Sequence, residues 1–176
     1  MRVTPTAIAG VLVIEPRVYA DERGFFFESY NERAFAQATG IAAKFVQDNH
    51  SRSVKNTVRG LHYQIQQPQG KLVRVVAGEI FDVVVDLRRS SPSFGRWSCH
   101  HLSAENKNML WIPAGLAHGF AVLSDTADFL YKTTDYWAPQ HERTLLWNDP
   151  DVAIAWPLAG EPILAAKDRV GKRLSE

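Results

Sequence analysis

The sequence has little of what marks secreted, membrane-bound or nucleic-acid-binding proteins. Its single cysteine, Cys99, excludes an internal disulfide and a cysteine-rich zinc site, and it favours a reducing compartment. Lys and Arg total 20 against 19 Asp and Glu, so the net charge of +1 offers no overall basic field for nucleic acid or a membrane surface. The apolar run at residues 7–14 is short, interrupted by Gly10 and without a basic region before it, and no other stretch approaches membrane-spanning length. We therefore expect a cytoplasmic protein in which any anion-binding site is local.

The composition is that of an ordinary globular domain. Hydrophobic residues make up 45% of the 176 residues and charged residues 22%, and this length suits one domain better than two. We expect a single domain over residues 1–176. Short apolar runs alternate with turns rich in Gly, Pro, Asn and Asp; they lie at residues 10–14, 25–28, 71–77, 80–87, 97–102, 109–112, 119–123 and 128–134. Many short strands at near-regular spacing, with no strand–helix alternation, predict an all-β fold that is closed or double-sheeted.

Local signals refine this outline. Gly78 and Glu79 predict a tight hairpin between the strands at 71–77 and 80–87, and the second of these strands is apolar enough to be buried on both faces. Capping residues at 29–32 predict a short helix that ends at Gly40. A polar quartet at 47–50 is followed by a stretch rich in Ser, Lys and Asn that predicts a loop up to residue 57. The polar tail at 167–173 is interpreted as a helix or loop folded back on the barrel.

The segment from residue 59 to residue 76 carries the clearest chemistry. It combines Arg59, His62 and Lys71 beside a run of β-rich sequence. An imidazole titrates near neutrality and can remove a proton if a carboxylate orients its other nitrogen. Nearby cations favour the neutral imidazole that a base requires, and they can stabilise an oxyanion formed when a proton leaves carbon beside a ketone.

Other interpretations of these residues remain open on pattern alone. His62 and His118 suggest a metal, but a metal-binding barrel of this type usually has two histidines one residue apart, and Gln64 occupies that position. A buried histidine bonded to backbone is a further alternative. Tyr131 is a core residue or a proton donor, and Trp137 packs in the core or stacks on a flat base.

Motifs along nearly the whole chain resemble one family, the dTDP-4-dehydrorhamnose 3,5-epimerases. They are DERGFFFE at 21–28, QDNHS at 47–51, RGLHYQ at 59–64, GKLVRV at 70–75, DVVVDLR at 82–88, SPSFG at 91–95, IPAGLAHGF at 112–120 and WNDP at 147–150. The resemblance implies a cupin-type jelly roll with short flanking helices, a homodimer, and no metal or organic cofactor. It also implies conversion of dTDP-4-dehydro-6-deoxy-D-glucose to dTDP-4-dehydro-6-deoxy-L-mannose, a step of dTDP-L-rhamnose synthesis.

The same resemblance implies roles for individual residues. His62 is the base, Asp168 orients it, Tyr131 returns a proton from the opposite face, and Lys71 stabilises the enolate. The expected substrate contacts are Arg23, Phe26, Glu28, Gln47, Asn49, Arg59, Lys71, His118, Trp137, Glu142 and Lys167. Trp137 stands where the family often has a tyrosine that stacks on thymine. Three alternatives remain: a related epimerase or ketoisomerase that acts at one centre, a non-catalytic nucleotide-sugar-binding barrel, and a metal-dependent cupin oxygenase.

Overall fold

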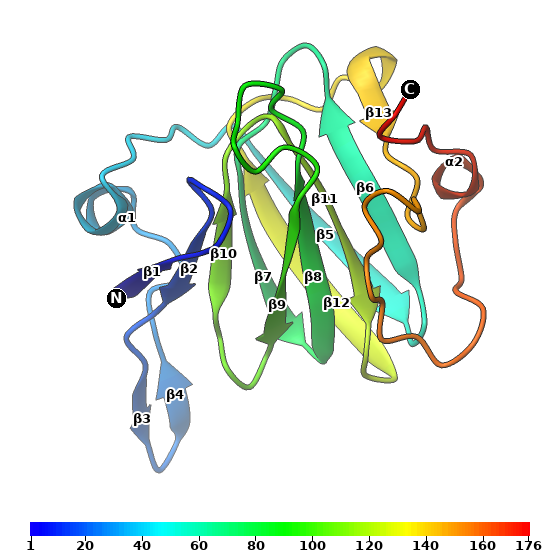
Figure 1. The fold of residues 1–176 in the computed structure, drawn as a ribbon. Helices are drawn as coiled ribbons and strands as arrows, with labels where there is room; N and C mark the ends of the chain where they lie inside the picture. The colour runs from blue at the N-terminus through cyan, green and yellow to red at the C-terminus, as the bar shows by residue number, and fades with distance from the viewer.

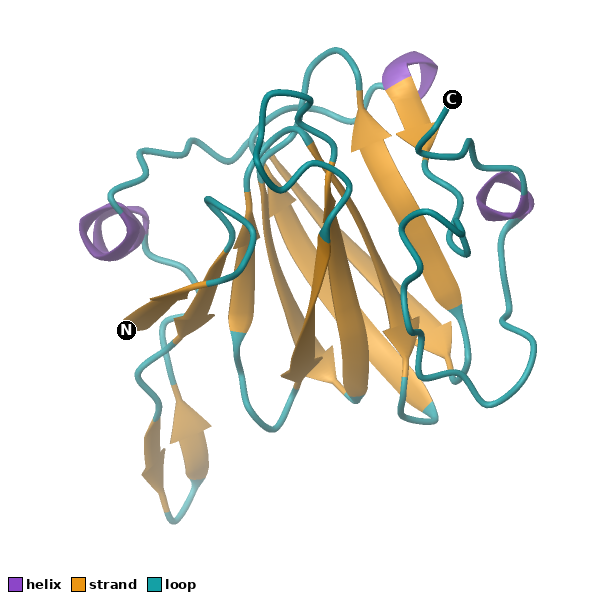
Figure 2. Cartoon of the chain, in the orientation of Figure 1, coloured by secondary structure: helices purple, strands orange, loops and turns teal.

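The chain folds mainly into two antiparallel β-sheets, as described by a computed structural model that covers residues 1–176 (Figures 1 and 2). The six-stranded sheet has the order β1 (Arg2–Pro5), β2 (Leu12–Glu15), β10 (Met109–Ile112), β7 (Lys71–Ala77), β12 (Thr126–Thr133) and β5 (Gln47–Val54). The five-stranded sheet has the order β13 (Glu142–Thr144), β6 (Val58–Gln64), β11 (Leu116–Val122), β8 (Glu79–Asp86) and β9 (Trp97–Ser103). A hairpin of β3 (Tyr19–Asp21) and β4 (Gly24–Phe26) projects from this body (Figure 1). Together with two short helices, α1 (Glu32–Thr39) and α2 (Ala166–Arg169), this confirms the predicted double-sheet all-β fold.

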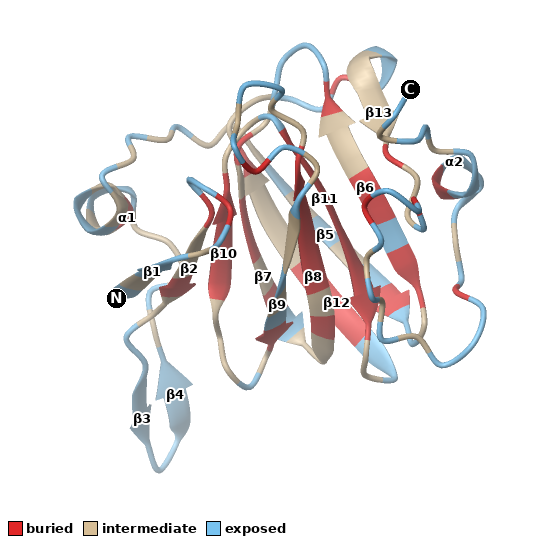
Figure 3. Cartoon of the chain, viewed as in Figure 1, coloured by how far each residue is buried: buried red, intermediate tan, exposed pale blue.

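The main core lies between the sheets. Val73 of β7 and Phe129 of β12 point inward from the six-stranded sheet and meet Val84 of β8 and Phe120 of β11 from the five-stranded sheet. Alternate residues of β8 point outward instead, and Val83 packs in a second apolar cluster on the outer face. The strand β8 is therefore buried on both faces, as its nearly continuous apolar sequence predicts (Figure 3).

Two segments cover the outer faces of the sheets. The helix α1 places Phe35 against Trp111 on the six-stranded sheet, and it starts at Asn31, whose side chain accepts a hydrogen bond from the Ala34 amide. It ends at Gly40, which adopts a φ of 72°, so the predicted helix and its stop are confirmed. The C-terminal segment folds back over the five-stranded sheet and carries α2 to the side of β6 (Figure 1). No helix combines the length and apolar character needed to cross a membrane.

Two local predictions are wrong. The strands β7 and β8 do not form a hairpin, because Gly78 turns the chain from one sheet into the other. Its φ is 73°, and a Cβ at this position would lie 2.0 Å from the Thr126 carbonyl oxygen, so the corner needs glycine for space as well as for conformation. The second error is the loop expected after residue 50, because residues 51–54 belong to β5, which pairs along its whole length with β12.

Candidate active site

A pocket of about 390 Å³ opens between the two sheets and collects most of the predicted site residues. The six-stranded sheet supplies Gln47, Asn49, Lys71 and Tyr131. The rest of the predicted lining comes from the five-stranded sheet and the segments beside it, namely Arg59, His62, His118, Trp137, Glu142, Lys167 and Asp168. Ser51, Gln69, Phe129 and Phe120 complete much of the wall. The pocket is thus polar at its centre although it is continuous with the apolar core.

The backbones of β6 and β11 approach closely where the two histidines project into the pocket. His62 and His118 are direct cross-strand partners, which places their side chains side by side on the inner face. A Cβ at Gly60 would lie 2.6 Å from the Gly119 Cα, and a Cβ at Gly119 would lie 2.5 Å from the Arg59 carbonyl oxygen. Glycines in both motifs are therefore what allow this approach.

His62 is held by a carboxylate from the far end of the chain. Its Nε2 lies 2.5 Å from Oδ1 of Asp168, which is only 1% exposed at the start of α2. The backbone amide of Gly60 lies 3.5 Å from the other carboxylate oxygen. Since a carboxylate accepts hydrogen bonds, the imidazole hydrogen sits on Nε2 and the Nδ1 lone pair is left to accept a proton. The structure thus brings Asp168 and His62 together across 106 residues of sequence.

His118 forms a second pair of the same kind, with a partner that sequence reasoning missed. Its Nε2 lies 2.8 Å from Oδ2 of Asp82, which is fully buried on β8. The other oxygen, Oδ1, has no hydrogen-bond partner. A carboxylate in the middle of an apolar strand was the available signal, because a buried acid needs a hydrogen-bonding or charged partner. The pocket wall therefore holds two Asp–His pairs on neighbouring strands.

Tyr131 and Lys71 face these histidines from the six-stranded sheet. Burial raises the pKa of the Tyr131 phenol, and the negative charge of Glu142 adds to the effect, so the phenol keeps its proton at neutral pH. Burial lowers the pKa of Lys71 to about 8, although Glu142 and Asp82 partly oppose the change. Lys71 is thus a cation at pH 7, in a position where desolvation strengthens its interaction with any developing negative charge.

Arg59 and Lys167 supply the remaining cations of the pocket. The Arg59 guanidinium is fixed by a 2.8 Å hydrogen bond from Nε to the buried Ser53 hydroxyl of β5, a contact that the sequence did not suggest. Lys167 pairs with Glu142 at 2.7 Å. Arg59 and Lys71 form no ion pair, so these two cations remain available to an anionic ligand, while the Asp168 carboxylate is paired with His62.

Three predicted substrate contacts lie outside the pocket. Arg23 and Phe26 belong to the projecting β3–β4 hairpin, where Phe26 is 68% exposed and Arg23 pairs with Asp21. Glu28 follows the hairpin and accepts a hydrogen bond from Asn31 at the start of α1. None of the three lines the pocket of its own chain.

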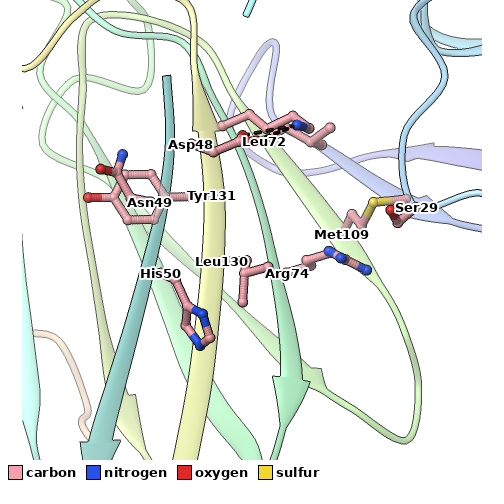
Figure 4. Close-up of a pocket in the computed structure, with 10 residues that line it drawn as sticks. Ser29, Asp48, Asn49, His50, Leu72, Arg74, Met109, Leu130 and Tyr131 are labelled. Carbon is pink, nitrogen blue, oxygen red and sulfur yellow. Dashed lines mark hydrogen bonds and ion pairs between the residues drawn. The ribbon is translucent and has the colours of Figure 1, made fainter. Parts of the chain in front are cut away.

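A second hollow, of about 330 Å³, lies on the outer face of the six-stranded sheet. Figure 4 shows Leu130, Arg74 and Met109 around it, while the neighbouring Tyr131 and Asn49 point to the opposite side of β12 and β5. The alternation of side chains along a strand explains this division, because successive residues face opposite sides of the sheet. The outer hollow and the pocket are therefore separated by one layer of β-sheet.

Comparison with known proteins gives a consistent group of relatives. A family profile described as dTDP-4-dehydrorhamnose 3,5-epimerase matches residues 5–176. The dTDP-4-dehydrorhamnose 3,5-epimerase of Pseudomonas aeruginosa is 62% identical over 176 residues, which covers 100% of this chain and 97% of that protein. The crystal structure of the dTDP-6-deoxy-D-glucose-3,5-epimerase of Legionella pneumophila Philadelphia 1, in complex with dTDP-4-keto-L-rhamnose, has a TM-score of 0.96 at 52% identity and covers 99% of this chain and 93% of its own. The dTDP-4-dehydrorhamnose 3-epimerase of Streptomyces niveus is 38% identical over 177 residues, covering 100% of this chain and 85% of that protein.

Proposed function

This chain belongs to the dTDP-4-dehydrorhamnose 3,5-epimerase family, and we propose that it is a cytoplasmic epimerase that inverts C3 and C5 of dTDP-4-dehydro-6-deoxy-D-glucose. The product is dTDP-4-dehydro-6-deoxy-L-mannose, and residues 1–176 act as one cupin-like domain. The observation that carries the proposal is that His62 and Tyr131 project into one pocket from facing sheets. A sugar ring bound between the sheets has a base on one face and an acid on the other.

Inversion of a carbon beside a ketone needs this division of labour. His62 Nδ1 takes the proton, and the buried Asp168 carboxylate stabilises the imidazolium that forms. Tyr131, whose raised pKa keeps it protonated, delivers a proton to the opposite face. A single base that returned its own proton would restore the starting sugar. No metal or organic cofactor is required, because enolate formation at the C4 ketone acidifies the C–H bonds at both C3 and C5.

The cations complete the substrate site. Lys71 stabilises the negative charge that develops on the C4 oxygen, which is an interaction stronger in the transition state than in the ground state. Arg59, held by Ser53, binds the diphosphate, since a guanidinium fork fits phosphate oxygens. Trp137 lies at the rim with its side chain 56% exposed, where it stacks on the thymine.

A single-centre epimerase is the second candidate, because the Streptomyces niveus relative is named as a 3-epimerase. The higher identity to the Pseudomonas aeruginosa 3,5-epimerase favours inversion at both centres. Incubation of the C4-keto substrate in D₂O, followed by NMR of the ring protons, separates the candidates. Deuterium at C3 and C5 supports the 3,5-epimerase, and deuterium at one centre supports the single-centre epimerase. No exchange at either centre would contradict both and indicate a non-catalytic nucleotide-sugar-binding protein. The variant His62→Ala should lose exchange at both centres, and normal exchange would show that the base is another group.

The exposed hairpin suggests how a homodimer completes the site. Arg23 and Phe26 match substrate-contact positions of the family, but neither lines the pocket of its own chain, and the hairpin that carries them projects from the body of the two sheets (Figure 1). Phe25 and Phe26 are 61% and 68% exposed, far more than isolated aromatic residues need to be. We include in the proposal that two subunits pair so that each hairpin reaches the pocket of the other.

Subunit complementation tests this arrangement. Arg23→Ala and His62→Ala chains are expected to be weakly active or inactive alone, and coexpression should restore activity, because about a quarter of the pockets in a statistical mixture would receive both intact residues. The matched control is His62→Ala with Tyr131→Phe, two residues of one pocket, which should restore nothing. Equal recovery in both mixtures, or none in either, would contradict a shared site.

A further inference from the structure

A glutamine beside the base ties the rim of the pocket to the barrel. Gln64 is the last residue of β6, two positions after His62, and its side chain is buried with a residue exposure of 8%. Its Nε2 donates to the Gln67 carbonyl at 2.7 Å and lies 3.3 Å from the Tyr136 carbonyl. Its Oε1 accepts from the Ala138 amide at 2.9 Å. Both ends of one amide therefore hold backbone, and two of the three contacts flank Trp137.

A second glutamine holds the residue between these contacts. The backbone amide of Trp137 donates to Oε1 of Gln47 at 3.0 Å, and Gln47 lies on β5 of the opposite sheet. Three consecutive residues are thus fixed by side chains from both sheets. The Trp137 indole itself is 56% exposed, so its own packing contributes little to its position. The backbone hydrogen bonds on either side consequently determine where the Trp137 Cα lies and in which direction its side chain leaves the chain.

We propose that Gln64 is a positioning residue for nucleobase recognition, which acts by holding Trp137 at the rim with its ring available for stacking. This inference rests on the proposed function, since it needs a nucleotide as ligand. A backbone segment that is already held in place loses less conformational entropy when a base stacks on the side chain it carries. The Gln64 carboxamide offers a donor and an acceptor in one planar group, whereas a methionine of similar length offers neither a strong donor nor a strong acceptor.

The test compares ligands with and without a base. Calorimetry should show that Gln64→Met binds dTDP about tenfold more weakly, as expected if most of a base-stacking contact is lost. Binding of inorganic pyrophosphate, which has no base, should be unchanged. In steady-state assays KM should rise while kcat is retained. The matched control is Gln66→Met, since Gln66 is an exposed glutamine of the loop that follows β6 and should give wild-type values. Gln64→Glu keeps the acceptor for Ala138 and provides a second variant if Gln64→Met is poorly folded.

A double-mutant cycle with Trp137→Ala separates positioning from general structural damage. If Gln64 acts through Trp137, the dTDP affinity of the double variant should match that of Trp137→Ala alone. Additive losses, or a fall in kcat without a change in KM, would overturn the inference and assign Gln64 to the support of β6. An unchanged dTDP affinity in Trp137→Ala would instead remove the stacking role from the proposed function. Normal affinity in Gln64→Met together with weak affinity in Trp137→Ala would overturn the positioning role only.

Discussion

Replacing Lys71 with methionine is expected to make the protein more stable and inactive at the same time. Burial lowers the pKa of Lys71 from its ordinary value of 10.5 to about 8, and the nearby carboxylates offset only part of this change. At about 1.4 kcal/mol for each pH unit, the charged ammonium destabilises the folded protein by about 3 kcal/mol at pH 7. Methionine has a similar length and no charge, so Lys71→Met should raise the free energy of unfolding by about that amount.

The gain in stability expected for Lys71→Met depends on pH. Between pH 8 and pH 10.5 the unfolded chain binds the Lys71 proton more tightly than the folded protein does, so the stability of the wild type rises with pH in this window. Urea denaturation at equal protein concentration should therefore show a large gain for Lys71→Met at pH 7 and almost none above a pH of about 11. The exposed Lys44 provides a control, and Lys44→Met should change stability by no more than about 0.5 kcal/mol. A Lys71→Met protein less stable than the wild type at pH 7, or one with a gain independent of pH, would refute the reasoning.

Further substitutions test the chemistry of the pocket. In the wild type kcat/KM should fall above a pH of about 8, because Lys71 loses its proton. Lys71→Arg should move this alkaline fall in kcat/KM to higher pH, since a guanidinium stays charged. If the fall stays at the same pH, the group that titrates is not Lys71. Asp168→Asn should lower kcat by about 10²- to 10⁴-fold, measured by substrate turnover, since the amide cannot stabilise the imidazolium; near-normal turnover would contradict the role of the pair. Tyr131→Phe should still take up deuterium from D₂O but without inversion, and rapid inversion would place the acid elsewhere. Ser53→Ala should raise KM about fivefold with kcat unchanged, as expected for loss of one hydrogen bond to Arg59, whereas a change in kcat alone would argue against a binding role.

The fold was predictable where local sequence and burial agree. The apolar strand β8 and the helix between Asn31 and Gly40 follow from residue type, periodicity and capping. The corner at Gly78 was not predictable in the same way, because a glycine turn has one local signature whether the chain returns to its own sheet or crosses to the other. The choice depends on contacts made by residues far along the chain, here the Thr126 carbonyl against which Gly78 packs.

The candidate site shows a different limit of sequence reasoning. The strand β5 gives no strand signal in the sequence because both of its faces are polar, yet it pairs fully with β12. Its inward residues Gln47, Asn49, Ser51 and Ser53 face a polar pocket, while its outward residues face solvent and ion pairs. A strand that lines a binding site lacks the apolar alternation on which strand prediction depends. The pairing of Asp168 with His62 has no local sequence signal for another reason, because the two residues are 106 positions apart in the sequence.

The polar strand β5 and the distant partner of His62 both follow from the double-sheet architecture. A single sheet could present His62 and Tyr131 only to one side of a substrate, whereas two facing sheets place a base and an acid on opposite sides of a ring held between them. The substrate must then occupy space that would otherwise be core, so most residues of β5, β6, β7 and β12 that line the pocket are polar, while other residues of β7 and β12 supply the apolar core between the sheets. Burial of this polar layer weakens the fold, as the lowered pKa of Lys71 indicates. The same burial keeps the Tyr131 phenol protonated and strengthens the interaction of Lys71 with negative charge on the substrate. The residues that destabilise the fold are therefore the ones on which inversion depends.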